Sequence, residues 1–193
     1  NSILAPDQLR QRVAWALSQI FVVSEEDLSG TTWAIPLASY YDMLSANAFG
    51  TYRELLEQVT LHPAMGVYLS MVRNQQADPS RNIRPDENYA REVMQLFSVG
   101  LVRLNLDGTA QVDSMGIGLP TYTQSTIEET ARVFTGWTYA GSPSFNNSGN
   151  PRNLVDVMIP FDDRDQVRKA IEARAHNRPQ AGVGRARTAA VSL

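Results

Sequence analysis

The sequence contains no cysteine, so disulfide bonds, thiolate nucleophiles and sulfur-ligated zinc or iron–sulfur sites are excluded. It also contains no apolar run near the roughly 20 residues that a membrane-spanning helix needs. The opening residues 1–6, NSILAP, have neither the basic start nor the apolar stretch of a signal peptide. We therefore expect neither a transmembrane segment nor a signal peptide within this stretch.

Lysine is nearly absent, because Lys169 stands alone against 16 arginines. Residues 1–163 contain 10 Arg and 18 Asp or Glu, whereas residues 164–193 contain 7 basic and 2 acidic residues. Nucleic-acid-binding surfaces cluster their basic residues on one element, and the acidic body shows no such cluster. We therefore expect no nucleic-acid partner.

The rest of the composition is that of a folded domain followed by a different kind of segment. A chain of 193 residues with 43% hydrophobic content can bury roughly two-thirds of its unfolded surface. Large apolar residues become rare after Ile171, where Ala, Arg, Gly and Val dominate. We expect residues 1–163 to be a partial helical domain, a fragment of a larger one, and residues 164–193 to be a basic tail that is disordered or read out of frame.

Apolar side chains recur at helical spacing through most of the body, and this predicts a mainly α fold. The expected architecture is an irregular multi-helix bundle with long loops. The expected helices cover residues 7–23, 35–48, 51–62, 63–73, 85–100 and 125–137. The apolar stripe expected on the first of these includes Leu9, Val13, Leu17, Ile20 and Phe21, and Trp15 is expected to be a core or interface anchor. Leu96 is expected on the buried arc of the helix over 85–100. Four inward-facing aromatic residues on the last two helices are expected to share one core: Tyr89, Phe97, Phe134 and Trp137.

Local signals fix several expected boundaries. Thr51 with Glu54, and Ser125 with Glu128, both have the spacing of a capping box at a helix start. Residues 101–111 alternate around Asp107-Gly108, which predicts a small β-hairpin. We find no internal sequence repeat.

The densest polar clusters lie on the last two expected helices. The candidate catalytic residues are Glu87, Arg91, Glu92, Glu128 and Arg132, with Asn88 and Trp137 as candidate substrate-binding residues. Carboxylates can move protons or hold a hard cation, and guanidinium groups bind anions through two parallel hydrogen bonds. If the two helices face each other, these groups would form one network or a metal site, although the sequence specifies neither a metal nor another cofactor.

Purely structural roles also explain these candidate residues, and the sequence favours them over catalytic roles. Glu87 and Arg91 are spaced as an i,i+4 ion pair, and Glu128 with Arg132 repeats that spacing. His62 precedes a proline at a helix junction, which is typical of a capping or turn residue rather than a metal ligand. The serines lack the G-x-S-x-G context of a nucleophile elbow.

Five ordered blocks of the sequence resemble a known bacterial family, the domain of unknown function 1800 (DUF1800). They cover residues 12–24, 40–53, 61–66, 84–100 and 122–137, and include LHPAMG and RPDENYAREVMQLFSVG. The resemblance implies a large, mainly helical, exported protein, periplasmic or extracellular, encoded beside an uncharacterised exported partner. It implies no activity. This chain departs from it at Ser18, where some relatives carry histidine, and after Asp163, where the resemblance ends.

Three functional hypotheses follow. The first is an uncharacterised exported helical domain with no assignable reaction, working in a cell-envelope or extracellular assembly with its genomic neighbour. The second is a metal-dependent or acid/base hydrolase-like enzyme that uses the Glu/Arg cluster. The third, weaker hypothesis is a carbohydrate-binding surface with exposed Trp33, Tyr40 or Tyr41, although their helical spacing favours burial.

Overall fold

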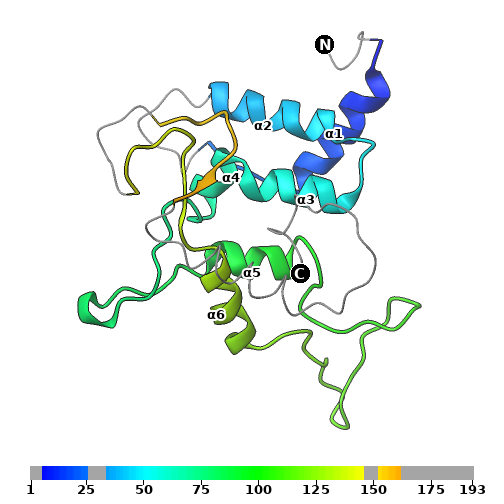
Figure 1. Cartoon of the computed structure of the whole chain (residues 1–193). Helices are drawn as coiled ribbons and strands as arrows, with labels where there is room; N and C mark the ends of the chain where they lie inside the picture. Colours follow the sequence, from blue (N-terminus) through cyan, green and yellow to red (C-terminus); the bar gives the residue numbers. More distant parts are fainter. Residues whose placement is uncertain (1–5, 26–33, 146–151, 162–193) are drawn as a thin grey trace, which may run out of the picture.

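Helices form where apolar residues recur every three or four positions, and they dominate the structure (Figure 1). This computed structural model describes residues 6–25, 34–145 and 152–161. The helices are α1 (Gln8–Ile20), α2 (Ala34–Ala46), α3 (Tyr52–Leu61), α4 (Pro63–Tyr68), the short 3-10 helix η1 (Pro79–Arg81), α5 (Asn88–Gln95) and α6 (Gln124–Val133). The expected mainly α fold is confirmed.

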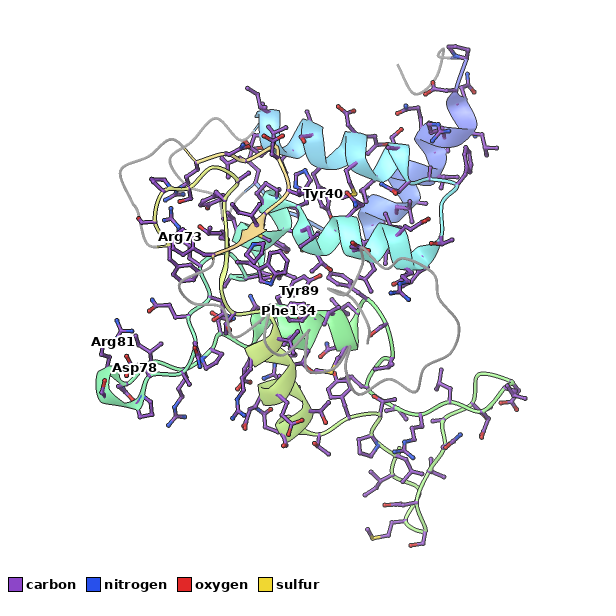
Figure 2. All side chains as sticks on the ribbon, viewed as in Figure 1. Tyr40, Arg73, Asp78, Arg81, Tyr89 and Phe134 are labelled. Atoms are coloured by element: carbon purple, nitrogen blue, oxygen red, sulfur yellow. The ribbon has the colours of Figure 1, made fainter. Side chains whose placement is uncertain are left out.

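The helices pack as two groups that share a core. Helix α2 packs against α1, α3 and α4, and α5 packs against α6. The hydroxyl groups of Thr60 on α3 and Tyr89 on α5 lie 2.7 Å apart and join the groups inside the core. The four aromatic residues expected to share a core do so, and the rings of Tyr89 and Phe134 meet edge to face at 4.9 Å between centroids (Figure 2).

Helix α1 buries only part of the stripe expected for it, since Phe21 is buried and Leu17 packs against the core. Ala14 and Phe21 are fully buried, whereas Trp15, predicted to be a core or interface anchor, is 62% exposed. Leu9 and Ile20, both placed on the expected apolar stripe, are exposed as well. Only one arc of a helix can face its neighbour, and Ala14 and Phe21, seven positions apart, define that arc.

The helices around His62 begin and end for local reasons. The expected capping box at Thr51 and Glu54 is confirmed at the start of α3. Helix α4 ends at Tyr68, five residues before the expected position, because Ser70 and Arg73 adopt left-handed backbone angles (φ of 58° and 60°). A right-handed helix cannot continue through such residues.

Helices α5 and α6 also differ in detail from the prediction. Helix α5 starts at Asn88 rather than Pro85, and Leu96, expected to be buried, is 59% exposed. The expected capping box at Ser125 and Glu128 is wrong, because Thr123 caps α6 and pairs with Thr126 instead.

A long arm, residues 101–121, leaves the bundle between α5 and α6 and extends away from it (Figure 1). The turn expected at Asp107-Gly108 is present, but isolated bridges such as Leu104 with Ala110 replace the expected strands. The strands of the described residues lie elsewhere: β1 (Trp137–Thr138) pairs antiparallel with β2 (Ile159–Pro160).

Some predictions lie outside the described residues. These are the basic tail, residues 164–193, and Trp33, a candidate for carbohydrate contact. Tyr40 is buried, and its hydroxyl group donates to the Phe21 carbonyl at 2.9 Å, which contradicts its exposure in the carbohydrate-binding hypothesis. Within the described ranges, no helix has the length and apolar character needed to cross a membrane.

Candidate functional site

A pocket of about 440 Å³ lies where the loop between α4 and α5 approaches one side of α6. It is lined by Ala77, Pro79, Asn82, Ile83, Arg84, Pro85, Glu87, Glu128, Ala131 and Arg132. Three of the five candidate catalytic residues, Glu87, Glu128 and Arg132, therefore line one pocket although they come from two different helical regions.

The base of the pocket loop is closed by a single asparagine. The Asn74 side chain accepts from the Asp86 backbone N–H at 2.7 Å and donates to the Asp86 carbonyl at 2.9 Å. The Asn74 carbonyl also accepts from the Gly136 N–H at 3.0 Å, which ties the loop to the segment after α6. Asn74 is buried, so these bonds are shielded from water and hold the loop in place.

The outer end of the loop is closed by a second set of bonds. Asp78 and Ile83 exchange two backbone hydrogen bonds of 3.0 Å each. The Asp78 carboxylate accepts from Ser80 and Arg81, and these bonds lower its pKa to about 2. Figure 2 shows Asp78 and Arg81 together at the end of this loop. One wall of the pocket is therefore held by hydrogen bonds within the loop itself.

Glu87 links the starts of α5 and α6. Its Oε2 atom accepts from Arg91 Nη2 at 2.9 Å and from Gln124 Nε2 at 2.9 Å. The same Gln124 nitrogen lies 3.5 Å from Oε1 of Glu128, so the two carboxylates are neighbours. The expected Glu87–Arg91 ion pair is present, whereas the described residues show no ion pair between Glu128 and Arg132.

Arg84 and Arg132 are the two cations that line the pocket. Both are largely exposed, and the side chain of neither makes a hydrogen bond or ion pair within the described residues. Each guanidinium group therefore keeps its donors available to a ligand. Sequence reasoning had not singled out Arg84, because only the closed loop brings it opposite α6.

The remaining candidate residues do not line the pocket. Glu92 and Arg91 lie further along α5, and Asn88 is exposed. Trp137 is buried in the core, so it does not provide the expected substrate contact. In the described part of the chain, no three His, Asp or Glu side chains are grouped so that they could hold a metal ion.

His62 is a structural residue, as expected. It caps α4 through Nδ1, which accepts from the Ala64 backbone N–H at 3.2 Å. Since Nδ1 is an acceptor, the proton of the neutral ring lies on Nε2, which points at Ser39 Oγ at 3.3 Å. A base for Ser39 would need the opposite tautomer, so this pair is not arranged for nucleophilic catalysis.

Comparison with known families gives a match over nearly the whole chain. Residues 1–183 match the model of a family described as a protein of unknown function (DUF1800). No curated protein and no solved structure matches the chain. The match continues past Asp163, so the end point that the sequence analysis gave to the resemblance is wrong. That residues 164–193 form a disordered or out-of-frame tail stays a prediction.

Proposed function

Because this chain belongs to the DUF1800 family, whose description names no activity, we propose its function from the pocket: it is a domain that binds an anionic ligand between the α4–α5 loop and α6. In this proposal Arg84 and Arg132 contact the anionic group of the ligand. A carboxylate or phosphate group matches the planar, forked donors of a guanidinium group.

The observation that carries the proposal is a pair of guanidinium groups that have no hydrogen-bond or ion-pair partner among the described residues. The nearby carboxylate of Glu87 pairs with Arg91, which neutralises its charge, and also accepts a hydrogen bond from the neutral Gln124 amide. Arg84 and Arg132 therefore outnumber the one remaining carboxylate of the lining, Glu128, and leave the pocket with a net positive charge.

The rest of the lining suits a ligand with both polar and apolar parts. Glu128 offers an acceptor for a hydroxyl or amino group, and Ile83 and Ala131 offer apolar contact. The ordered loop lowers the entropic cost of binding, because Asn74 and Asp78 hold it without a ligand.

Titration of the chain with inorganic phosphate and with acetate, followed by NMR, tests the proposal. We expect both anions to perturb the Arg84 and Arg132 side-chain signals. Substitution Arg132→Gln is expected to weaken binding about tenfold, since one charge-assisted hydrogen bond in a partly solvated pocket contributes roughly 1.5 kcal/mol.

The matched control is Arg53→Gln, an exposed arginine on α3 that does not line the pocket. This variant is expected to bind as the unchanged chain does. Equal binding by the Arg132→Gln and Arg53→Gln variants would contradict the assignment, as would shifts that spread evenly over all arginines.

The contact of Gln124 with both Glu87 and Glu128 favours a second candidate, an acid/base enzyme. One of two neighbouring carboxylates can donate a proton to a substrate while the other accepts one. Assays of ester, amide and phosphate-ester hydrolysis by the unchanged chain and by the Glu87→Gln and Glu128→Gln variants test this. Equal rates for all three proteins, or no turnover by any of them, would remove the candidate.

The cellular setting is a further part of the proposal. We place the protein outside the cytoplasm, in an assembly with a genomically neighbouring exported protein; the resemblance in the sequence supports this. Cell fractionation of the full-length protein, followed by affinity purification with its neighbour, tests both statements. A cytoplasmic protein that purifies alone would overturn them.

A further inference from the structure

The arm, residues 101–121, has an eight-residue structural repeat that its sequence does not reveal. Three positions eight residues apart form a closed ring of backbone hydrogen bonds. The Gln111 N–H donates to the Arg103 carbonyl at 2.8 Å, the Leu119 N–H to Gln111 at 2.8 Å, and the Arg103 N–H to Leu119 at 2.9 Å.

The isolated bridges follow the same spacing. They pair Val102 with Pro120, Leu104 with Ala110, and Val112 with Gly118. The arm is therefore a three-sided element whose segments pair with one another. Since each of the three ring residues both donates and accepts, the ring has no open strand edge at these positions.

Aspartate side chains hold the two turns of the arm. Asp107 Oδ1 accepts from the backbone N–H and the hydroxyl group of Thr109, at 3.0 and 2.7 Å. Asp113 Oδ1 accepts from the N–H groups of Met115 and Ile117, at 2.8 and 2.9 Å. Gly116 lies between them in the left-handed region (φ of 80°), which favours glycine. The arm is held by its own bonds.

This ordered arm is unusually apolar on the outside. Its exposed large hydrophobic residues are Leu101, Leu104, Leu106, Val112, Met115 and Ile117. Leu96 and Val99, just before the arm, are also exposed. At on the order of 100 Å² per side chain, these eight expose roughly 800 Å² over all sides of the arm and its base, an area of the same order as one partner buries in an interface of standard size.

We propose that the arm is a dimerisation element that packs against the same arm of a second copy of this chain. The exposed apolar area is of the order that a stable symmetric dimer needs, and twofold dimers are the commonest assemblies of identical chains.

The charge of the arm agrees with this partner. Its three charged residues are Arg103, Asp107 and Asp113. Each of the three is bonded within the arm, Arg103 through Nε to the Pro120 carbonyl at 3.1 Å. Two arms can therefore meet without strong repulsion between like charges, and a highly charged partner would find little to pair with.

Sedimentation velocity over a range of concentrations tests the proposal on the full chain. We expect a dimer that dissociates on dilution. The double substitution Leu106→Asp and Met115→Asp is expected to raise the dissociation constant at least hundredfold, because each change acts in both copies. Both side chains lie outside the core, and the far-UV circular dichroism spectrum should be unchanged.

The matched control is the double substitution Leu9→Asp and Trp15→Asp on the exposed side of α1, which should leave the dimer intact. If the aspartate arm variant loses its fold, the milder pair Leu106→Ser and Met115→Ser serves instead. A monomer at every concentration overturns the proposal. A dimer that is weakened by the control variant but not by the arm variant also overturns it. The same holds if the chain is a monomer whose arm binds a different protein.

Discussion

His62 is a buried histidine whose ring joins two helices. It caps α4, and its ring lies edge-on to Tyr40 at 5.1 Å between centroids. Burial lowers its pKa to about 4, because the charged form would lose its hydration. The fold therefore accommodates the neutral ring and resists the imidazolium ion.

This burial predicts that acid destabilises the fold through His62. The pKa of an unfolded histidine is about 6.5, so below that pH the unfolded chain binds a proton that the folded chain refuses until about pH 4. The contribution of His62 is complete above pH 6.5 and lost as pH falls, by about 2 kcal/mol at pH 5.

Urea unfolding of the wild type and of His62→Asn, at pH 7 and pH 5, measures this contribution. Asparagine keeps a side-chain acceptor for the Ala64 N–H but does not titrate. The drop in unfolding free energy between the two pH values should be about 2 kcal/mol larger for the wild type. An identical drop in both proteins would contradict the assignment.

Some residues of the pocket could be predicted from local sequence spacing, and others could not. The i,i+4 spacing of Glu87 and Arg91 was enough to predict their ion pair, because a helix places them side by side. Arg84 and Asn74 carry no such local signal. Their roles depend on the loop that Asn74 closes with Asp86, twelve residues further along the chain, and helical spacing does not predict that contact.

Helix α6 was predicted correctly as a helix, but its predicted capping residue was wrong. The chain offers two possible capping boxes here, Thr123 with Thr126 and Ser125 with Glu128, and each pair has the i,i+3 spacing that a capping box needs. The two possible caps lie two residues apart. The extended backbone needed at a cap occurs at Thr123 (φ of −111°, ψ of 169°), so the helix begins there.

The corrected cap makes a prediction that separates the two candidates. Thr123→Ala should lower the unfolding free energy by about 1 kcal/mol, because it leaves the Thr126 N–H without its acceptor. Ser125→Ala, one residue inside the helix start, should change it by less than about 0.5 kcal/mol. Chemical denaturation measures both, and a larger loss for Ser125→Ala would restore the original cap.

For the whole molecule, stability depends on the core that joins the α1–α4 group to α5 and α6. Tyr89 is fully buried there, and burial raises its pKa, while its hydroxyl group meets Thr60 and its ring meets Phe134. Phe134 thus supports α5 from the end of α6.

Truncating this core should cost far more than truncating an exposed ring of similar hydrophobicity. Phe134→Ala should lower the unfolding free energy by about 3 to 4 kcal/mol, since it leaves a cavity beside Tyr89. Trp15→Ala, on the exposed side of α1, should lower it by less than about 1 kcal/mol. Thermal and chemical unfolding compare the two, and similar losses would place Trp15 in the core as first expected.

Local chemistry was enough to predict the helical class, the cap at Thr51, the turn at Asp107-Gly108 and the shared burial of Tyr89 and Phe134. The cap and the turn depend on hydrogen bonds within a few residues, and the burial of Tyr89 and of Phe134 follows from the periodicity of each one's own helix. The folded chain was needed for the buried face of α1, the pocket around Arg84 and Arg132, and the closed ring of the arm. Each of these joins residues at least eight positions apart, beyond the reach of helical periodicity and capping, and such residues meet only through packing and backbone bonds between segments.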